Sequence, residues 1–299
     1  MVWRSGILLL PMLVNYATII AEVESPMYNG KYTKEDIIRQ LDALRVPKGV
    51  PVLMHTSLRA IGPVEGGGEA LLSILIEYFT RDGGLLCIPT HTWDNLGNEI
   101  TLDVNDDDQC LGTFSGLAIR DGRGVRSENP THSMVVFGDR ERAESFVRDE
   151  LWVSTPTTPS SCYGKLYDMG GVVLLAGVAH NKNTFLHTVD EMLNIPNRMD
   201  NKPVPVTVRR QNGQLVSSEL CLFYTDYTED ISYRFVKYET AFRYHRCITD
   251  GYLGNAPVQL CDTRKMKQTV ELIYQNSGGV DPLADEEAIP PKWYCTGTF

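Results

Sequence analysis

The sequence of 299 residues lacks several signatures that would identify a function directly. Its seven cysteines are scattered, and no two of them form a Cys-x-x-Cys pair. This usage suits reduced thiols in the cytoplasm, and it disfavours a disulfide framework or a thiolate zinc site. The six histidines show neither His-x-x-x-His nor His-Glu-x-x-His spacing, so we expect no metal. The Gly-x-Ser-x-Gly motif of α/β-hydrolases is also missing.

Positive charge is scarce relative to negative charge. The chain has 28 Lys and Arg against 38 Asp and Glu, which gives a formal net charge of −10. That balance opposes binding to nucleic acid and favours cationic partners. With 42% hydrophobic and 22% charged residues, the chain is close to globular averages and can bury a sizeable core.

A long apolar run is also missing, although the amino terminus comes near to one. Asn15 and the polar residues after it interrupt the run before it reaches the ~20 residues that a membrane span needs. Residues 1–26 are therefore either an upstream extension before a natural start at Met27 or a weak signal-like segment. We expect no stable membrane insertion, a cytoplasmic protein, and a single domain over residues 27–299.

Local patterns predict a β-α-β unit near the start of this domain. A helix is expected over 34–44 with Thr33 as its N-cap, followed by a buried strand over 50–54. A glycine turn at 66–68 leads into a second helix over 69–79, and another apolar strand follows at 85–88. Strand, turn, helix and strand in this order predict two parallel strands.

The alternation of strands and helices continues toward the carboxyl terminus. Strands are expected at 134–137 and 172–175, and helices at 141–150, 164–168 and 262–275. Residues 91–129 lose periodicity and are interpreted as a long loop. Alternating residues around Asn212-Gly213 predict a hairpin that adds an antiparallel section to the sheet.

Two segments carry residues suited to chemistry. The segment 55–68 follows the first strand with hydroxyls, Arg59 and glycines, which suits anion binding, although a plain turn explains it equally well. His187 lies in a predicted helix capped by Asn183 or Thr184, and acids follow it at the third and fourth positions. An imidazole held by a carboxylate is a suitable general base, and a structural histidine is the competing interpretation.

Taken together, these motifs resemble the aminoglycoside 3-N-acetyltransferase family, whose members transfer acetyl from acetyl-CoA to a sugar amine. Four blocks carry the resemblance, and they occur in family order at 52–62, 126–133, 163–166 and 183–187. The resemblance implies an α/β/α sandwich with a central mixed, partly parallel sheet, which differs from the fold of the larger acetyltransferase superfamily. It also implies acetyl-CoA as the co-substrate, no metal, and a small cationic amine as the partner.

The resemblance further implies roles for individual residues. His187 is the expected general base, which takes a proton from the amine as the amine attacks the thioester, and Glu191 or Asp190 is expected to orient it. The expected residues are, for the cofactor, Ser57, Leu58, Arg59, Gly66 and Ser133, and for the substrate, Thr90, Asp94 and Asp190. Asp94 and the acids at 106–108 could attract the cation, although a solvated acidic loop is an equally good interpretation of them.

This sequence departs from the family pattern at some positions, and more than one function stays open. Asn129 stands where the family commonly has histidine, and the substrate side diverges from the resistance enzymes. The acceptor is therefore either the 3-amino group of an aminoglycoside or a different amine. A CoA-binding homologue without turnover is a second hypothesis, and a metal-dependent amide hydrolase that uses His187 and His91 is a third. The sequence does not indicate the oligomeric state.

Overall fold

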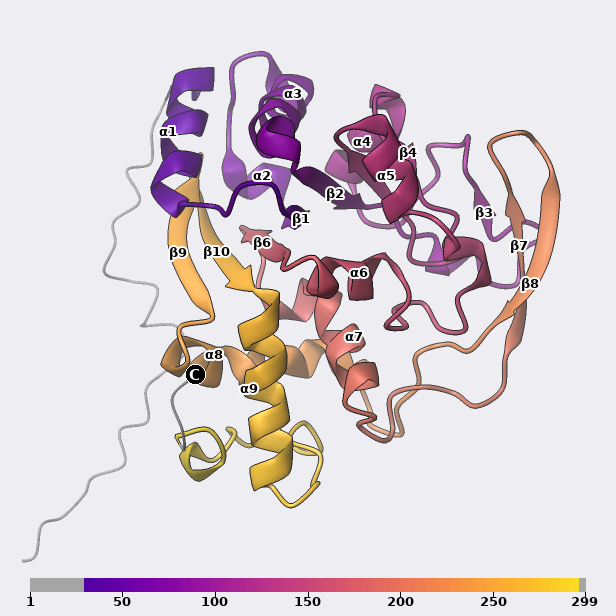
Figure 1. The fold of residues 1–299 in the computed structure, drawn as a ribbon, viewed down its shortest axis with the longest axis vertical. Helices are drawn as coiled ribbons and strands as arrows, with labels where there is room; N and C mark the ends of the chain where they lie inside the picture. Colours follow the sequence, from indigo (N-terminus) through magenta and orange to yellow (C-terminus); the bar gives the residue numbers. More distant parts are fainter. Residues whose placement is uncertain (1–29, 296–299) are drawn as a thin grey trace, which may run out of the picture.

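The computed structural model describes residues 30–295, and its central sheet carries helices on both faces (Figure 1). The helices and strands are α1 Lys34–Leu44, β1 Pro51–Thr56, α2 Leu58–Ile61, α3 Gly67–Thr80, β2 Leu85–Pro89, β3 Leu102–Asp103, α4 Thr113–Asp121, β4 Val125–Arg126, β5 Met134–Phe137, α5 Arg140–Phe146, α6 Cys162–Asp168, β6 Val172–Ala176, α7 Phe185–Met192, β7 Val204–Arg209, β8 Leu215–Leu220, α8 Glu239–Tyr244, β9 Ile248–Leu253, β10 Ala256–Asp262 and α9 Thr263–Asn276. The apolar segment 1–26 lies outside the described residues. Within 30–295, no helix is both long and apolar enough to cross a membrane.

The first helix forms as the sequence predicts. The Thr33 hydroxyl accepts a hydrogen bond from the backbone of Asp36, and the Asp36 carboxylate accepts one from the backbone of Thr33. This reciprocal capping box satisfies two amide groups that a helix start leaves unpaired. Ile37 and Leu41 lie on the buried face, so α1 is fixed by both its cap and its packing.

The main sheet has seven strands in the order β4-β5-β2-β1-β6-β10-β9. Strands β2, β1 and β6 are parallel, and α3 connects β1 to β2, which confirms the predicted β-α-β unit. Strands β5 and β10 flank this parallel centre in antiparallel orientation. The sheet is therefore mixed and partly parallel, as the family resemblance implied.

Helices cover both faces of the sheet because its central strands are apolar on both sides. Along β1, Val52 and Met54 pack in one core with α1, α3 and α4, whereas Leu53 packs in the other core with α5 to α9. Continuous apolar runs of this kind are typical of parallel strands that are buried on both faces. The expected α/β/α sandwich is confirmed (Figure 1).

Three expectations about the elements were wrong. The region 91–129 is not a continuous loop, because it contains α4 and two short strands. The hairpin β7–β8 does form at Asn212-Gly213, but it builds a separate sheet with β3 instead of joining the main one. Helix α5 ends at Phe146, and the backbone turns left-handed at Asp149 before a 3-10 turn begins.

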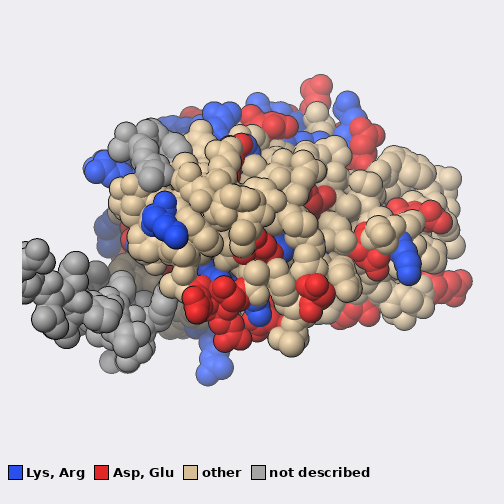
Figure 2. Space-filling model, turned by 90° about the horizontal axis from the view of Figure 1, so that it is seen from below, with Lys and Arg blue, Asp and Glu red and all other residues tan. Residues whose placement is uncertain are grey.

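Charge on the molecular surface is mixed. On the face seen from below in Figure 2, acidic and basic side chains are interspersed, with one dense acidic group near the lower edge. The basic residues coloured on this face do not form a continuous patch (Figure 2).

Candidate active site

A cavity of about 450 Å³ opens at the carboxyl ends of β1 and β2, beside the start of α7. The carboxyl ends of parallel strands meet at one edge of a sheet, which is where ligands commonly bind in α/β folds. Its lining comprises His55, His91, Trp93, Leu96, Leu111, Thr131, His132, Pro156, Asn181, Lys182, Asn183, Thr184, His187, Leu222, Phe223, Asp230, Ser232 and Tyr233. Four of the lining residues are histidines, and His187 is one of them.

His187 is held in this cavity by aromatic packing. Its ring stacks on Phe223 with centroids 4.0 Å apart and meets the edge of Phe235 at 4.8 Å. Burial lowers the pKa of His187 to about 4; the nearby Asp230 carboxylate raises it, and Arg198 lowers it. The imidazole is therefore neutral near pH ~7 and can accept a proton.

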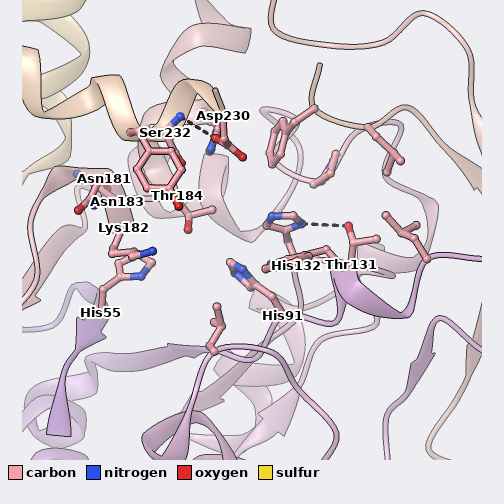
Figure 3. Close-up of a pocket in the computed structure, with 18 residues that line it drawn as sticks. His55, His91, Thr131, His132, Asn181, Lys182, Asn183, Thr184, Asp230 and Ser232 are labelled. Carbon is pink, nitrogen blue, oxygen red and sulfur yellow. Dashed lines mark hydrogen bonds between the residues drawn. The ribbon is translucent and has the colours of Figure 1, made fainter. Parts of the chain in front are cut away.

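Asp230 is the carboxylate that faces the imidazoles, and the sequence analysis did not identify it. It begins the 3-10 helix Ile231–Tyr238 by accepting a hydrogen bond from the backbone of Ser232 at 2.8 Å (Figure 3). Burial opposes its ionisation, but the Ser232 hydrogen bonds and the nearby His187 and His132 outweigh burial and lower the pKa of Asp230. Asp-x-Ser ahead of an amphipathic segment is an N-cap signal, and it could have drawn attention to this position.

The expected pairing of His187 with Asp190 or Glu191 does not form. Asp190 accepts a hydrogen bond from Arg198 at 2.6 Å, deep in the protein. Glu191 accepts hydrogen bonds from the hydroxyls of Thr155 and Thr157. Helical spacing does bring these acids near His187 along the chain, but stronger donors from other segments take both carboxylates.

The other imidazoles belong to a buried polar network. The Nε2 atom of His91 lies 2.9 Å from the Tyr163 hydroxyl, which donates to the carbonyl oxygen of His132. The Nδ1 atom of His132 lies 3.0 Å from the Thr131 hydroxyl (Figure 3). Burial lowers the pKa of His55 to about 3, with Lys182 adding to the effect, and burial lowers the pKa of His132 to about 3. The pKa of His91 also lies well below its usual value because the ring is buried.

A second cavity of about 380 Å³ adjoins the first. Ser57, Leu58 and Arg59, which were expected to contact the cofactor, line this cavity. His55, Leu111 and Lys182 are common to the linings of both cavities. The junction between the two spaces therefore lies at His55 and Lys182, which lie together in Figure 3.

The remaining expected site residues lie outside both linings. Ser133 is fully buried and donates a hydrogen bond to the carbonyl oxygen of Thr90, and the two side-chain hydroxyls are 3.0 Å apart. Gly66 forms a left-handed turn at φ 75°, where an added Cβ would lie 2.7 Å from the Cβ of Ala70. Asp94 is exposed on the turn that carries Trp93. Ser133 and Thr90 thus brace the strands, and Gly66 shapes a turn.

Metal binding finds no support in this arrangement. Among residues 30–295, no three or more His, Cys, Asp or Glu side chains are grouped so that they could hold an ion. Tyr163 and Thr131 engage two of the imidazoles, and His187 packs against aromatic rings. The metal-dependent hydrolase therefore stays a hypothesis without structural support.

Comparison with known proteins identifies the family. The model of the aminoglycoside 3-N-acetyltransferase family matches residues 53–274. Aminoglycoside N(3)-acetyltransferase IV of Salmonella sp. is 32% identical over 170 residues, which cover 56% of this chain and 61% of that enzyme. The prophage-derived aminoglycoside N(3')-acetyltransferase-like protein YokD of Bacillus subtilis is 25% identical over 197 residues, which cover 59% of this chain and 71% of that protein. The match to the Salmonella enzyme thus spans less than two thirds of that enzyme's length.

Solved structures agree over more of the chain. Apo aminoglycoside acetyltransferase AAC(3)-IVa superposes with a TM-score of 0.69 at 28% identity, covering 85% of this chain and 91% of that one. A histidine-to-alanine mutant of that enzyme, in complex with a gentamicin, gives 0.71 at 27% identity, covering 89% and 95%. AAC-IIIb with CoASH shares the fold, with a TM-score of 0.71 at 20% identity over 84% and 99%. The fold is therefore that of the antibiotic acetyltransferases, and the chain belongs to the aminoglycoside 3-N-acetyltransferase family.

Proposed function

We propose that this protein transfers the acetyl group of acetyl-CoA to a primary amine. The observation that carries the proposal is the junction of two cavities, one of which contains the neutral His187 facing Asp230. A thioester at the junction and an amine in the larger cavity would meet beside an imidazole that can accept a proton. Membership of the family supports the same reaction class.

In the proposed reaction, His187 removes a proton from the acceptor as its nitrogen attacks the thioester carbonyl carbon. The new C–N bond forms as the C–S bond breaks, and the CoA sulfur leaves with the electron pair. The proton held by His187 then passes to that thiolate, so the imidazole returns to its neutral form. Asp230 stabilises the transient imidazolium, as the carboxylate of a Ser-His-Asp triad does.

The second cavity supplies the binding site for acetyl-CoA in this proposal. Arg59 is exposed at its lining and provides a cation for the phosphates of CoA. Leu58 lies beside Arg59 and offers apolar contact, and the backbone of Ser57 begins α2 there. The roles of Ser57, Leu58 and Arg59 thus stay as expected, whereas Gly66 and Ser133 are left out of the proposed cofactor site.

The acceptor has one candidate that follows from the relatives alone. Proteins named aminoglycoside N(3)-acetyltransferase and a gentamicin complex at 27% identity favour the 3-amino group of an aminoglycoside. The CoA-binding homologue without turnover predicts a different outcome. It would be stabilised thermally by CoA and would consume no thioester with any amine.

Acetyl-CoA-dependent thiol release by the purified protein tests the proposed reaction. His187→Ala should lower the rate by about 10²- to 10⁴-fold, the usual contribution of a general base. Asp230→Asn should also lower the rate, by a smaller factor, because the imidazole remains in place. Asp226→Asn is the matched control, since Asp226 lies on the same loop but bonds to Asn197 instead of lining the cavity.

Circular dichroism and CoA-induced thermal stabilisation establish that each variant is folded and still binds CoA. A folded His187→Ala protein with unchanged turnover would remove His187 from the mechanism. Equal losses in Asp230→Asn and Asp226→Asn would remove Asp230.

A further inference from the structure

The larger cavity carries almost no net charge. Asp230 is the one carboxylate in its lining, and the Lys182 ammonium offsets it. Burial keeps the pKa values of the four lining imidazoles low, so these rings are neutral near pH ~7. Figure 3 shows Asp230 above the open space and Lys182 beside His55 at its left.

The mouth of this cavity is apolar and aromatic. Trp93, Leu111 and Tyr233 line it while remaining 47%, 43% and 55% exposed. The Lys182 ammonium lies 5.9 Å from the centre of the Tyr233 ring. Exposed aromatic side chains at the rim of a concave site are typical of contacts with an apolar or ring-shaped ligand.

The acidic loop, residues 103–108, does not supply the missing negative charge. Its carboxylates are already engaged by other groups of the protein: Asp103 with Arg209 at 2.9 Å, Asp107 with Arg120 at 2.7 Å, and Asp108 with Asn95 at 2.7 Å. Asp94 is exposed to solvent, where an ion pair contributes little. The acids nearest to His187 in sequence are bound by Arg198 and two threonines.

We infer that the acceptor is an amine with a single positive charge on an apolar, ring-sized body, and that this pocket rejects polycationic aminosugars. The inference rests on the proposed function and narrows its substrate class. One ammonium group can pair with Asp230 before it loses its proton to His187. Each further ammonium group would leave water without a carboxylate to meet it and would be repelled by Lys182, which is costly in a partly buried site.

Two ring-matched probes test the inference directly. Cyclohexylmethylamine carries one amine and 1,3-bis(aminomethyl)cyclohexane carries two, and both present the same ring to the pocket. We expect kcat/KM to be roughly tenfold higher for the monoamine, and lower still for gentamicin and apramycin. Added salt should narrow the difference between the two probes, because it screens the repulsion.

Reversal of the charge at residue 182 provides the second arm. Lys182→Glu should raise kcat/KM for the diamine relative to the monoamine by roughly tenfold. Lys31→Glu makes the same charge change outside both cavity linings, and it should leave that ratio unchanged. The KM for acetyl-CoA is measured in each variant, because Lys182 also lines the second cavity.

The outcomes separate the two levels of the claim. Acetylation of the diamine or gentamicin at equal or higher kcat/KM would overturn the inference and leave the proposed acetyl transfer standing. A Lys182→Glu ratio equal to that of Lys31→Glu would also overturn it. Absence of acetylation with every amine would overturn the proposed function together with the inference.

Discussion

Replacement of the buried Arg198 by methionine should strongly destabilise the protein. Its guanidinium donates to Asp190 at 2.6 Å and holds Asp281 with two hydrogen bonds at 2.8 and 2.7 Å. The three side chains are 3%, 1% and 9% exposed. They join α7, which carries His187, to the loop that follows it and to the carboxyl-terminal segment.

The size of the loss follows from burial. Removal of one partner from a buried ion pair leaves an uncompensated charge and costs about 3–5 kcal/mol. Here two carboxylates lose their cation, so the upper part of this range is expected. For a protein of this size the loss corresponds to a fall in Tm of roughly 6–20 °C.

Arg243→Met is the matched control for this prediction. Arg243 also bridges two carboxylates, Glu239 at 2.6 Å and Asp250 at 2.7 Å, but its side chain is 39% exposed. Solvent-exposed pairs contribute about 0–1 kcal/mol. Thermal and urea unfolding of both variants provides the comparison, and equal losses would refute the role assigned to burial.

Three further predictions follow from other buried groups. The acid limb of kcat/KM should lie at about pH 4, because His187 accepts a proton only above its lowered pKa, and Asp230→Asn should move this limb to lower pH; a limb near pH ~6.5 would contradict the assignment. Asn129→Asp places a second carboxylate 3.2 Å from Glu150, so the folded protein should retain a proton that the unfolded chain releases. The Tm deficit of this variant should therefore grow as pH rises from about 5 to 8, and a constant deficit would argue against it. Arg126→Gln removes donors to four backbone carbonyls, so limited proteolysis should cleave the acidic loop faster than in the wild type.

The sequence predicted elements that local patterns define and missed those that depend on distant partners. Helix α1 was correct because Thr33 caps it and its apolar spacing is regular. Strands β9 and β10 were missed, since their polar outer residues leave only a weak pattern and they are stabilised by antiparallel pairing with β6. The separate sheet of β3, β7 and β8 was missed for the same reason, because β3 is two residues long and exists only through its partner.

For the candidate site, the sequence identified residue types and the fold decided their partners. His187, Ser57, Leu58 and Arg59 were found from motifs and line the two cavities. Asp230, which lies 43 residues after His187 in the sequence, faces it only because the 3-10 helix Ile231–Tyr238 packs over α7. No local spacing encodes such a contact, and helical spacing favoured the wrong acids.

The sequence by itself determined the family, the order of the β-α-β unit and the general base expected to accept the proton, since each depends on short motifs or local periodicity. Only the tertiary structure decided which carboxylate meets His187, which acids are neutralised within the protein, and that the acceptor cavity is close to uncharged. These properties depend on burial and on distances between segments remote in sequence. Both the pKa of a side chain and the strength of an ion pair depend on that environment as well as on residue type.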